Sequence, residues 1–331
     1  MENPFKDRTY KYGVETYLLM YLQDYQFILG ADLARYSESN DDDAFFNKDN
    51  PCNIYFVLRR PKVTIKPESF ITNGQKTCFD FVIHKKGDFI PIPISIESLK
   101  ASSILELETV YPYNLFIITD GLNPIYGGRP GTIIDNTEVG NNIENELLDY
   151  EILYIGQSYG KDGSRTALDR LSVHETVQKI YTDSLTNTPD CDIWILLTNF
   201  VQESHLLNLA ENSIKSNIEN ENVDTEKSKS FFDTGLKFTE KQKINFTEAA
   251  LIRYFEPIYN KEFKSTFPNE KHTSYSECYT LDIRGITIEL YMPEMVRCMY
   301  TAKTGRIKHH YHTFEFQNDK DRISLLGMNE L

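Results

Sequence analysis

The sequence has few of the features that mark membrane, disulfide-rich or zinc-binding proteins. No stretch approaches the run of about 18 uncharged apolar residues that a membrane-spanning helix needs, and the start, Met1 to Lys6, lacks a hydrophobic signal region. The five cysteines are odd in number, widely spaced and form no CxxC pair, which argues against a disulfide framework and a zinc ribbon. We therefore expect a soluble, cytoplasmic protein that does not associate with membranes.

Basic side chains are also scarce, with 35 Lys and Arg against 49 Asp and Glu, for a net charge of −14. This balance favours solubility and opposes tight non-specific binding to nucleic acid. Hydrophobic residues make up 40% of the chain and aromatic residues 13%, so it can bury a sizeable core, and global disorder is excluded. The length of 331 residues predicts about two domains, or one elaborated domain.

Short apolar runs bounded by Pro, Gly, Asn or Lys predict β-strands. They lie at residues 54–58, 79–83, 89–94, 114–119, 193–197 and 286–291. The aromatic and aliphatic segment Tyr17 to Leu29 is compatible with a helix. Residues 120–142 are rich in turn formers, and residues 213–230 are polar and charge-mixed, which is typical of surface insertions.

The first candidate for chemistry is the predicted strand Glu151 to Ser158. In a strand, Tyr154 and Gly156 point to the same face, and the glycine leaves open space beside the phenol. An aromatic residue packed on a strand that ends in a turn is the competing interpretation.

The second candidate is a pair of cations after a Gly/Ser-rich loop, which misses the P-loop spacing. A helix is expected from Ala167 to Tyr181, where Arg170 and His174 would share a face. A guanidinium can clamp a phosphate, and an imidazole one turn away can carry a proton. The alternative is an exposed pair with no role.

The third candidate is a carboxylate on the apolar stripe of a helix predicted from Thr247 to Phe255. Glu248 shares the stripe of Leu251 and Ile252, so its carboxylate points toward the core. A buried carboxylate is costly unless it is paired or bound to a cation. Capping of the first helical turn and binding of a magnesium ion both answer this problem.

These pieces, in this order, resemble the signature motifs of the GIY-YIG endonuclease superfamily. Tyr154-Ile155-Gly156 resembles its second signature strand, and Arg170 with His174 resembles its Arg-x-x-x-His helix. Glu248 resembles its metal-binding glutamate, and Asn260, twelve residues later, its closing asparagine. The resemblance covers about residues 114–261.

No clear Gly-Ile-Tyr strand precedes Tyr154, so the first signature tyrosine is left open. If residues 114–119 are the first signature strand, Phe116 stands in its place, and a phenyl ring cannot exchange a proton. Tyr113, Tyr126 and Tyr159 are the other candidates.

The resemblance implies an α+β fold with a small antiparallel sheet flanked by helices. We predict this nuclease module at residues 111–262, with inserts at about 120–149 and 211–235. A β-rich N-terminal domain of unknown role would occupy residues 1–110, and a β-rich C-terminal extension residues 263–331.

The resemblance also implies a metal-dependent DNA endonuclease of a restriction or phage-defence type that uses one Mg²⁺ or Mn²⁺ ion. Tyr154, helped by His174, would accept a proton from the attacking water or hold the phosphate. Arg170 would stabilise charge on the phosphate, Glu248 would bind the metal, and Asn260 would fix the local geometry. Enzymes that cut both strands commonly act as dimers, so a homo-oligomer is compatible with this function.

Two alternatives remain open. In the first, the chain is a catalytically impaired protein of the same type that only binds nucleic acid or a partner. In the second, its function lies elsewhere, for example in the basic tail, where the spacing of His309 and His312 is compatible with binding a metal. The acidic balance does not exclude the nuclease, because residues 1–150 hold 14 basic and 22 acidic side chains, a net charge of −8. We therefore expect DNA binding to be local, metal-assisted and sensitive to salt.

Overall fold

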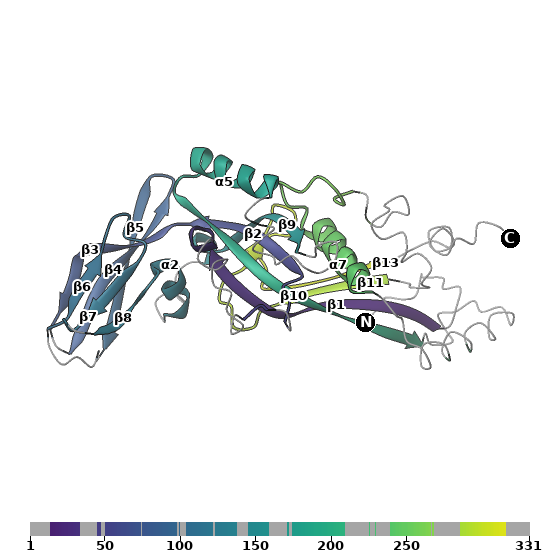
Figure 1. Cartoon of the computed structure of the whole chain (residues 1–331), viewed down its shortest axis with the longest axis horizontal. Coiled ribbons are helices and arrows are strands. Elements are labelled where there is room, and N and C mark those ends of the chain that lie inside the picture. Colours follow the sequence, from purple (N-terminus) through teal and green to yellow (C-terminus); the bar gives the residue numbers. More distant parts are fainter. Residues whose placement is uncertain are drawn as a thin grey trace, which may run out of the picture.

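The computed structural model combines one large β-sheet, an inserted β-structure and two helices that cover the large sheet (Figure 1). The residues that it describes are 14–33, 45–47, 50–73, 75–97, 99, 104–121, 123–137, 145–158, 171, 174–208, 225, 229, 239–265, 267 and 285–315.

Seven strands form the large sheet, in the spatial order β12-β9-β2-β10-β1-β11-β13. Neighbouring strands are antiparallel except that β11 pairs with β1, and β12 with β9, in parallel. The strands are β1 (Val14–Leu29), β2 (Ile54–Pro61), β9 (Tyr150–Gln157), β10 (Cys191–Asn208), β11 (Gly285–Tyr291), β12 (Met299–Tyr300) and β13 (His309–Glu315).

The prediction of a small antiparallel sheet flanked by helices, with separate β-rich parts at either end, is therefore wrong. The sheet is large and mixed in direction, and strands dominate the described residues. Strands β1 and β2 come from the predicted N-terminal domain, and β11 and β13 from the predicted C-terminal extension. They pair with the central strands and thereby satisfy their backbone groups and cover apolar surface, so the predicted boundaries at residues 110 and 263 cut across one sheet.

Residues 17–29, which were expected to form a helix, belong to β1. Leu18 and Met20 are fully buried, whereas Leu19 and Tyr21 are only partly so, which is the two-residue period of a strand. The strand pairs with β10 along its whole length, from Val14 opposite Asn208 to Leu29 opposite Trp194. This long ladder supplies a backbone partner at nearly every residue, and it outweighs the helical propensity of the leucines.

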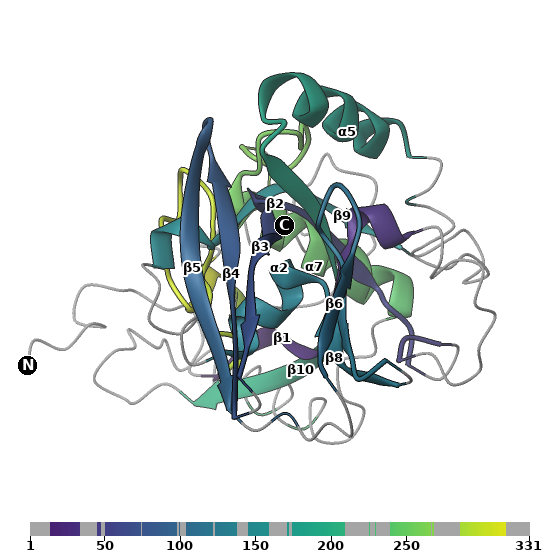
Figure 2. The same cartoon turned by 90° about the vertical axis from the view of Figure 1, so that its left-hand side faces the viewer.

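An insert between β2 and β9 forms a second structure with its own core. Two three-stranded sheets, β3-β4-β5 and β6-β7-β8, pack against each other through Phe79, Phe81 and Phe116, whose ring centroids lie 5.4–5.7 Å apart. Figure 2, in which this insert faces the viewer, shows the two sheets side by side. The elements are β3 (Val63–Thr72), β4 (Lys76–Lys85), β5 (Asp88–Glu97), β6 (Glu106–Thr109), β7 (Phe116–Thr119), β8 (Pro124–Gly128), α2 (Pro130–Ile133) and the 3-10 turns η2 (Ile134–Asn136) and η3 (Asn145–Leu147); a further 3-10 turn, η1 (Gly30–Asp32), follows β1.

A buried ion cluster joins the insert to the large sheet. The guanidinium groups of Arg60 in β2 and Arg297 are both buried, and both bond the carboxylate of Asp135 in η2, at 2.7 and 2.8 Å. The Arg60 guanidinium also lies over the rings of Tyr150 and Trp194. This cluster holds the insert and the large sheet together. Because two buried cations share one carboxylate, substitution of any of the three residues would leave buried charge unbalanced.

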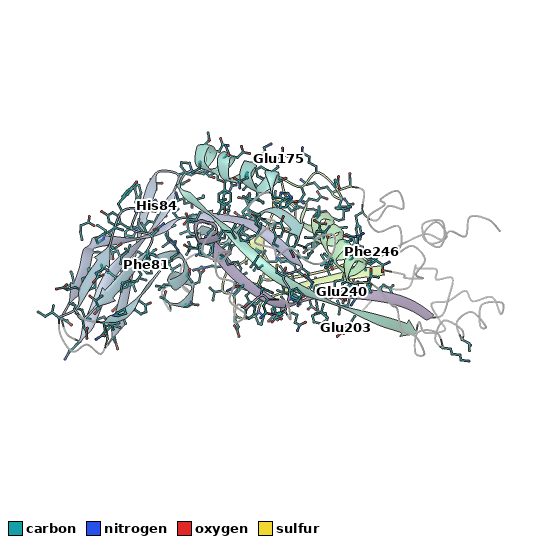
Figure 3. The ribbon with its side chains drawn as sticks, viewed as in Figure 1. Phe81, His84, Glu175, Glu203, Glu240 and Phe246 are labelled. Atoms are coloured by element: carbon teal, nitrogen blue, oxygen red, sulfur yellow. The ribbon has the colours of Figure 1, made fainter. Side chains whose placement is uncertain are left out.

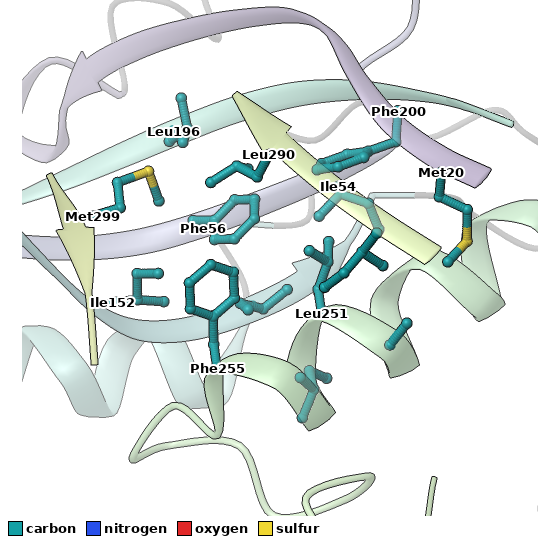
Figure 4. Packing of buried hydrophobic residues seen from close by; sticks show 14 of the residues in the cluster. Met20, Ile54, Phe56, Ile152, Leu196, Phe200, Leu251, Phe255, Leu290 and Met299 are labelled. Atoms are coloured by element: carbon teal, nitrogen blue, oxygen red, sulfur yellow. The ribbon is translucent and has the colours of Figure 1, made fainter. Parts of the chain in front are cut away.

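Helices α5 (Glu175–Asn187) and α7 (Glu240–Phe255) cover opposite faces of the large sheet. Alternate residues of β2 separate the two faces, because Phe56 packs in the cluster of Leu251 and Phe255 of α7, whereas Val57 packs in the cluster of Ile180 of α5. Figure 4 shows the first of these clusters, with Phe56 against Phe255 at a ring-centroid distance of 6.2 Å.

Helix α7 begins earlier than predicted and ends where predicted. Thr239 and Gln242 form a reciprocal capping box, so the helix starts at Glu240. It ends at Phe255, because Glu256 adopts a left-handed conformation, with φ 49°, directly before Pro257. Glu248 therefore lies in the middle of the helix and cannot serve as an N-terminal cap.

Candidate active site

Tyr154 lies on β9, directly beside a second tyrosine that the sequence analysis missed. Strand β9 pairs antiparallel with β2, and Gly156 stands opposite Tyr55 in the register. The rings of Tyr55 and Tyr154 lie 6.1 Å apart, and Tyr55 is fully buried whereas Tyr154 is half-buried.

Gly156 makes this juxtaposition of phenols possible. A methyl group at position 156 would lie 2.6 Å from both Cζ and Oη of Tyr55, and 2.9 Å from Cε1 of Tyr154. The space beside the Tyr154 phenol that the sequence predicted is therefore filled by the Tyr55 phenol. A signal for Tyr55 was present, because Asn53-Ile54-Tyr55 differs from Gly-Ile-Tyr at one position, but the apolar run 54–58 was interpreted only as core.

The residues considered for the first signature position do not approach Tyr154 where the structure describes them. Tyr126 lies in β8, and Tyr113 and Phe116 pack with it in the core cluster of the insert, which is separate from the cluster that contains Tyr154. Tyr159 lies outside the described residues. Phe116 is buried against Phe79 and Phe81, so it is a core residue.

The free edge of β9 is closed by side chains and backbone from α7 and the segment that follows it. Strand β12 pairs with β9 at Tyr150 and Glu151, and beyond them no strand of the described residues pairs with this edge. Along it, the Leu153 carbonyl accepts from the Tyr259 N–H at 3.1 Å, and the Asn260 side-chain amide bonds both backbone groups of Ile155, at 3.0 and 2.8 Å. Successive outward-facing residues of a strand are two apart, so these partners mimic a neighbouring strand.

Glu248 is the next partner along this edge. Its Oε1 accepts from the Gln157 backbone N–H at 3.1 Å, and its Oε2 accepts from the Gln157 side-chain amide at 2.8 Å. The structure thus brings Tyr154, Glu248 and Asn260 together around one strand, although up to 106 positions separate them in the sequence.

His174 lies in the same region, but it precedes helix α5 and is not inside a helix as predicted. The helix was expected to begin at Ala167, but α5 begins at Glu175, and His174 is its N-cap residue with extended backbone (φ −79°, ψ 116°). The His174 imidazole lies 5.5 Å from the Tyr154 ring, measured between centroids. Arg170 lies outside the described residues, and because α5 starts after His174, the two do not share a face of this helix.

These residues surround a cleft with a volume of about 500 Å³. Tyr154, Gln157, Glu248 and Asn260 line it on one side, and the first turns of α5 line it on the other, where Figure 3 labels Glu175. The lining carries both charge signs, with two lysines and three glutamates: Lys179, Lys261, Glu175, Glu248 and Glu262. A mixed, polar lining of this size suits a charged group with bound water better than an apolar ligand.

The far wall of the cleft is fixed by a hydrogen bond between α5 and the segment after α7. The Tyr259 phenol donates to the Asp183 carboxylate at 2.8 Å. Burial, and then this bond to a carboxylate, raises the pKa of Tyr259, so its phenol stays protonated as a donor at neutral pH. Tyr259 therefore has a structural role, because it links α5 to the segment that follows α7.

Glu248 is the carboxylate in this cleft that the sequence predicted as a metal ligand. Both of its oxygens accept hydrogen bonds from Gln157, and because a carboxylate oxygen can have more than one partner, the same group can also ligate a cation. Within the described residues no group of three or more His, Cys, Asp or Glu side chains is placed to share a metal ion. The donor set therefore fits an ion held by one carboxylate together with water and substrate oxygens, as is common for Mg²⁺, and does not fit an all-protein cage.

The two tail histidines do not form a site. His309 and His312 are three apart on β13, so their side chains point to opposite faces. His309 bonds Glu289 at 2.8 Å, whereas the His312 ring lies 5.3 Å from the ring of Tyr254.

Comparisons with protein-family models, with curated proteins and with solved structures gave no significant match to this chain. None of the described helices is long and apolar enough to cross a membrane.

Proposed function

We propose that this protein is a metal-dependent DNA endonuclease that hydrolyses phosphodiester bonds by a one-metal mechanism like that of the GIY-YIG endonucleases. The observation that carries the proposal is the convergence of Tyr154, Glu248 and Asn260 on one polar cleft. Further support comes from the neighbouring strand, where Asn53-Ile54-Tyr55 places a second tyrosine beside the Tyr-Ile-Gly strand.

The roles of the side chains follow from where they lie. Tyr154 lines the cleft, and the other phenol there, that of Tyr259, donates to Asp183, so Tyr154 accepts the proton of the attacking water or holds a phosphate oxygen. The His174 imidazole beside it takes the proton onward. Tyr55 is buried behind Gly156, so it positions Tyr154 and does not meet the substrate.

In the mechanism that the resemblance implies, Arg170 supplies the positive charge that the developing phosphorane needs in addition to the metal ion. Asn260 holds β9 in place through its two bonds to Ile155, and this fixes Tyr154 and Gln157 on either side of that residue. A 1 Å displacement of such groups costs orders of magnitude in rate, so Asn260 contributes by positioning.

Glu248 would hold the Mg²⁺ or Mn²⁺ ion, with Gln157 orienting its carboxylate. When bound, such an ion stabilises negative charge on the phosphate and on the leaving oxygen. The mixed charge of the lining predicts that binding depends on this ion and weakens steeply with salt. The insert, which has its own core, fits a restriction or defence nuclease that reads a particular target, more than a small repair enzyme.

The test is a cleavage assay on plasmid and genomic DNA, modified and unmodified, with Mg²⁺ or Mn²⁺ and with EDTA as the blank. We expect wild-type protein to cut at least one substrate, and Glu248→Gln to reduce the single-turnover rate at least about 100-fold, because the metal supplies several kcal/mol. The matched control is Glu240→Gln on the same helix, whose exposed carboxylate pairs with Lys243 outside the cleft and whose loss should leave the rate unchanged.

A second outcome would favour the alternative function. If wild-type protein binds DNA but cuts none of these substrates with either metal, the proposal of catalysis fails. The chain would then be a catalytically impaired protein of this type that binds nucleic acid.

A further inference from the structure

A second and larger cavity, of about 680 Å³, lies between the insert and the large sheet. One wall is the outer face of β3, β4 and β5, a second wall is the segment Tyr111 to Asn114, and one end is closed by Pro189 and Asp192 at the start of β10. We name this cavity the insert groove. None of the residues assigned to catalysis lines it.

Three aromatic side chains line the insert groove and keep much of their surface in solvent. Tyr111 is 85% exposed and Phe89 66% exposed, and Tyr113 is half-buried, with its ring 6.0 Å from that of Tyr111 in an edge-to-face arrangement. Aromatic residues on a monomer are more commonly buried than exposed in a group, so their clustering around a cavity indicates a binding surface. Their flat faces suit a flat ligand that stacks.

Apart from Lys62, Lys66 and the exposed Glu68, the polar side chains that line the insert groove are acceptors and uncharged donors. The Asp192 carboxylate lies at its end, burial raises the pKa of this group, and no described residue donates a hydrogen bond to it. His84 bonds the Thr64 hydroxyl through Nε2 at 2.9 Å, and burial followed by the charge of Lys62 lowers the pKa of its imidazole, so it is neutral at pH 7. A half-buried carboxylate without a donor is costly, and a ligand that offers an N–H would satisfy it.

Lysines surround the rim. Lys66 is exposed at one side of the groove, and Lys62 donates to the Pro189 carbonyl at 2.6 Å at the other. The β4–β5 turn, with Lys85 and Lys86, is tied to the same end because the Lys86 N–H donates to Asp190. Cations at the rim and aromatic rings inside form the combination that binds the backbone and bases of a single strand.

We infer that the insert groove binds an unstacked nucleobase of the DNA substrate, stacked on Tyr111 and Phe89, with its exocyclic amino group donating to Asp192. Cytosine N4 and adenine N6 offer such a donor, whereas thymine and uracil offer a carbonyl oxygen at the same place. Bases taken out of the stack are commonly held in this way, between aromatic side chains and polar groups that read the base edge. The choice of a nucleic-acid strand as the source of the base rests on the proposed function.

The position of the insert groove relative to the candidate active site supports this choice. Helix α5 joins the two, because Glu175 at its start lines the catalytic cleft and Pro189, two residues beyond its end, lines the insert groove. Figure 3 labels Glu175 at the start of the helix and His84 beside its other end. Thirteen helical residues span about 20 Å, which is about six nucleotides of B-form DNA along one strand. One bound DNA can therefore reach both sites.

The experiment measures binding of fluorescent twelve-residue oligo(dC) and oligo(dU) to the full chain in EDTA at pH 7.5, so that no cleavage intervenes. These two bases differ at the position that Asp192 would read. We expect oligo(dC) to bind about tenfold more tightly than oligo(dU). Asp192→Asn should remove this preference, and Tyr111→Ala should weaken both oligomers about tenfold through loss of stacking. Tyr311→Ala, which removes an exposed tyrosine of β13, is the matched control and should bind as wild type.

Several results would overturn the inference. Equal affinity of wild-type protein for the two oligomers would do so, as would a Tyr111→Ala variant that binds both as wild type. The Tyr111 side chain is too exposed for its loss to unfold the protein, so that variant remains informative even where Asp192→Asn is unstable. If dCMP competes as well as the oligomer does, the site takes free nucleotides and the assignment to a strand is wrong. Glu248→Gln should bind the oligomers as the wild type does, because this residue does not line the groove. A loss of cleavage and a loss of binding in the insert groove are therefore distinguishable.

Discussion

Both carboxylate oxygens of Glu248 accept hydrogen bonds from Gln157, Oε1 from the backbone N–H and Oε2 from the side-chain amide. One residue of β9 thereby fixes the orientation of a carboxylate that α7 presents to the cleft. The backbone bond continues the row of partners that Tyr259 and Asn260 provide along the same edge. Glu248 consequently has a structural contact with the strand, and its carboxylate also lines the cleft, where it can ligate a cation.

The first prediction concerns the side-chain half of this contact. Gln157→Ala removes the 2.8 Å bond and leaves the backbone bond in place, so the carboxylate remains in the cleft but is less well oriented. We expect a cleavage rate about tenfold lower and a stability loss of about 1 kcal/mol, because the bond is partly exposed. Gln157→Glu places a second carboxylate against Glu248 and should lower the rate further. Single-turnover kinetics at saturating Mg²⁺ and thermal unfolding measure both effects, and an Ala variant with the wild-type rate would show that Glu248 needs no such support.

The second prediction concerns the packing of the two phenols against Gly156. Gly156→Ala places a methyl group 2.6 Å from the Tyr55 ring, in a strand that cannot move away because β2 and the α7 segment flank it. We expect a loss of about 1–3 kcal/mol of stability and a displaced Tyr154. Tyr55→Leu in the same chain creates the missing room, so the double variant should be more stable than the sum of the two single losses predicts. Additive losses in this double-mutant cycle, measured by urea unfolding, would contradict the contact.

Part of this structure could be predicted from local sequence. The β-branched and aromatic runs at residues 54–58, 79–83 and 193–197 form β2, β4 and β10, as expected from their period and bounding residues. The grouping of Tyr154, Glu248 and Asn260 was also predicted, because it depends on motif order and not on the size of the sheet. The strands are local features, whereas the grouping of the three site residues was indicated by the resemblance to a family's motif order.

The large sheet could not be predicted, because it is built from pairings across great sequence distances. The central neighbours β9 and β2 are separated by the whole insert, so the pairing of Tyr55 with Gly156 had no local signal except the incomplete Asn-Ile-Tyr motif. The leucine-rich sequence of β1 is equally compatible with a helix. Its conformation is decided by its pairing with β10, which lies more than 160 residues away in the sequence. Such tertiary pairing overrides propensity without leaving a signal in the segment itself.

The third prediction concerns the side chain that replaces a neighbouring strand. Asn260 donates to the Ile155 carbonyl and accepts from its N–H, and all of these groups are buried. Asn260→Ala leaves both backbone groups without partners, so we expect a loss of about 2–4 kcal/mol. Asn260→Asp keeps an acceptor for the Ile155 N–H, but its carboxylate is repelled by the Ile155 carbonyl. We expect it to reduce the stability as much as the Ala variant does. Amide hydrogen exchange at Ile155 reports the effect directly, and unchanged protection in the Ala variant would contradict it.

The fourth prediction concerns the junction of the insert with the large sheet. Asp135→Asn removes the carboxylate charge that bonds the buried guanidinium groups of both Arg60 and Arg297, which costs about 3–5 kcal/mol. We expect the insert to loosen first, and limited proteolysis between residues 62 and 148 to accelerate. Asp88→Asn, an exposed carboxylate at the start of β5, is the control and should be cut at the wild-type rate. Equal proteolysis of all three proteins would show that Asp135 does not hold the junction.

The last prediction concerns the dependence of stability on pH. The His310 imidazole is buried between the Tyr254 hydroxyl, 3.2 Å from Nδ1, and the Met299 carbonyl, 2.9 Å from Nε2. Burial lowers the pKa of His310 to about 4 from an ordinary value of 6.5, although the bond to Met299 opposes the shift. Between these two pH values the unfolded chain binds a proton that the folded chain does not.

Stability must therefore rise with pH across this window. The contribution of His310 is fully present above about pH 6.5 and is lost as the pH falls toward 4, and it amounts to about 3 kcal/mol at most. His310→Gln keeps a donor for the Met299 carbonyl but cannot titrate, so its stability should depend less steeply on pH between 6.5 and 4 than that of the wild type. Urea unfolding at several pH values measures the difference, in which the titration of all other groups cancels, and parallel curves for His310→Gln and the wild type would show that folding does not lower the pKa of His310.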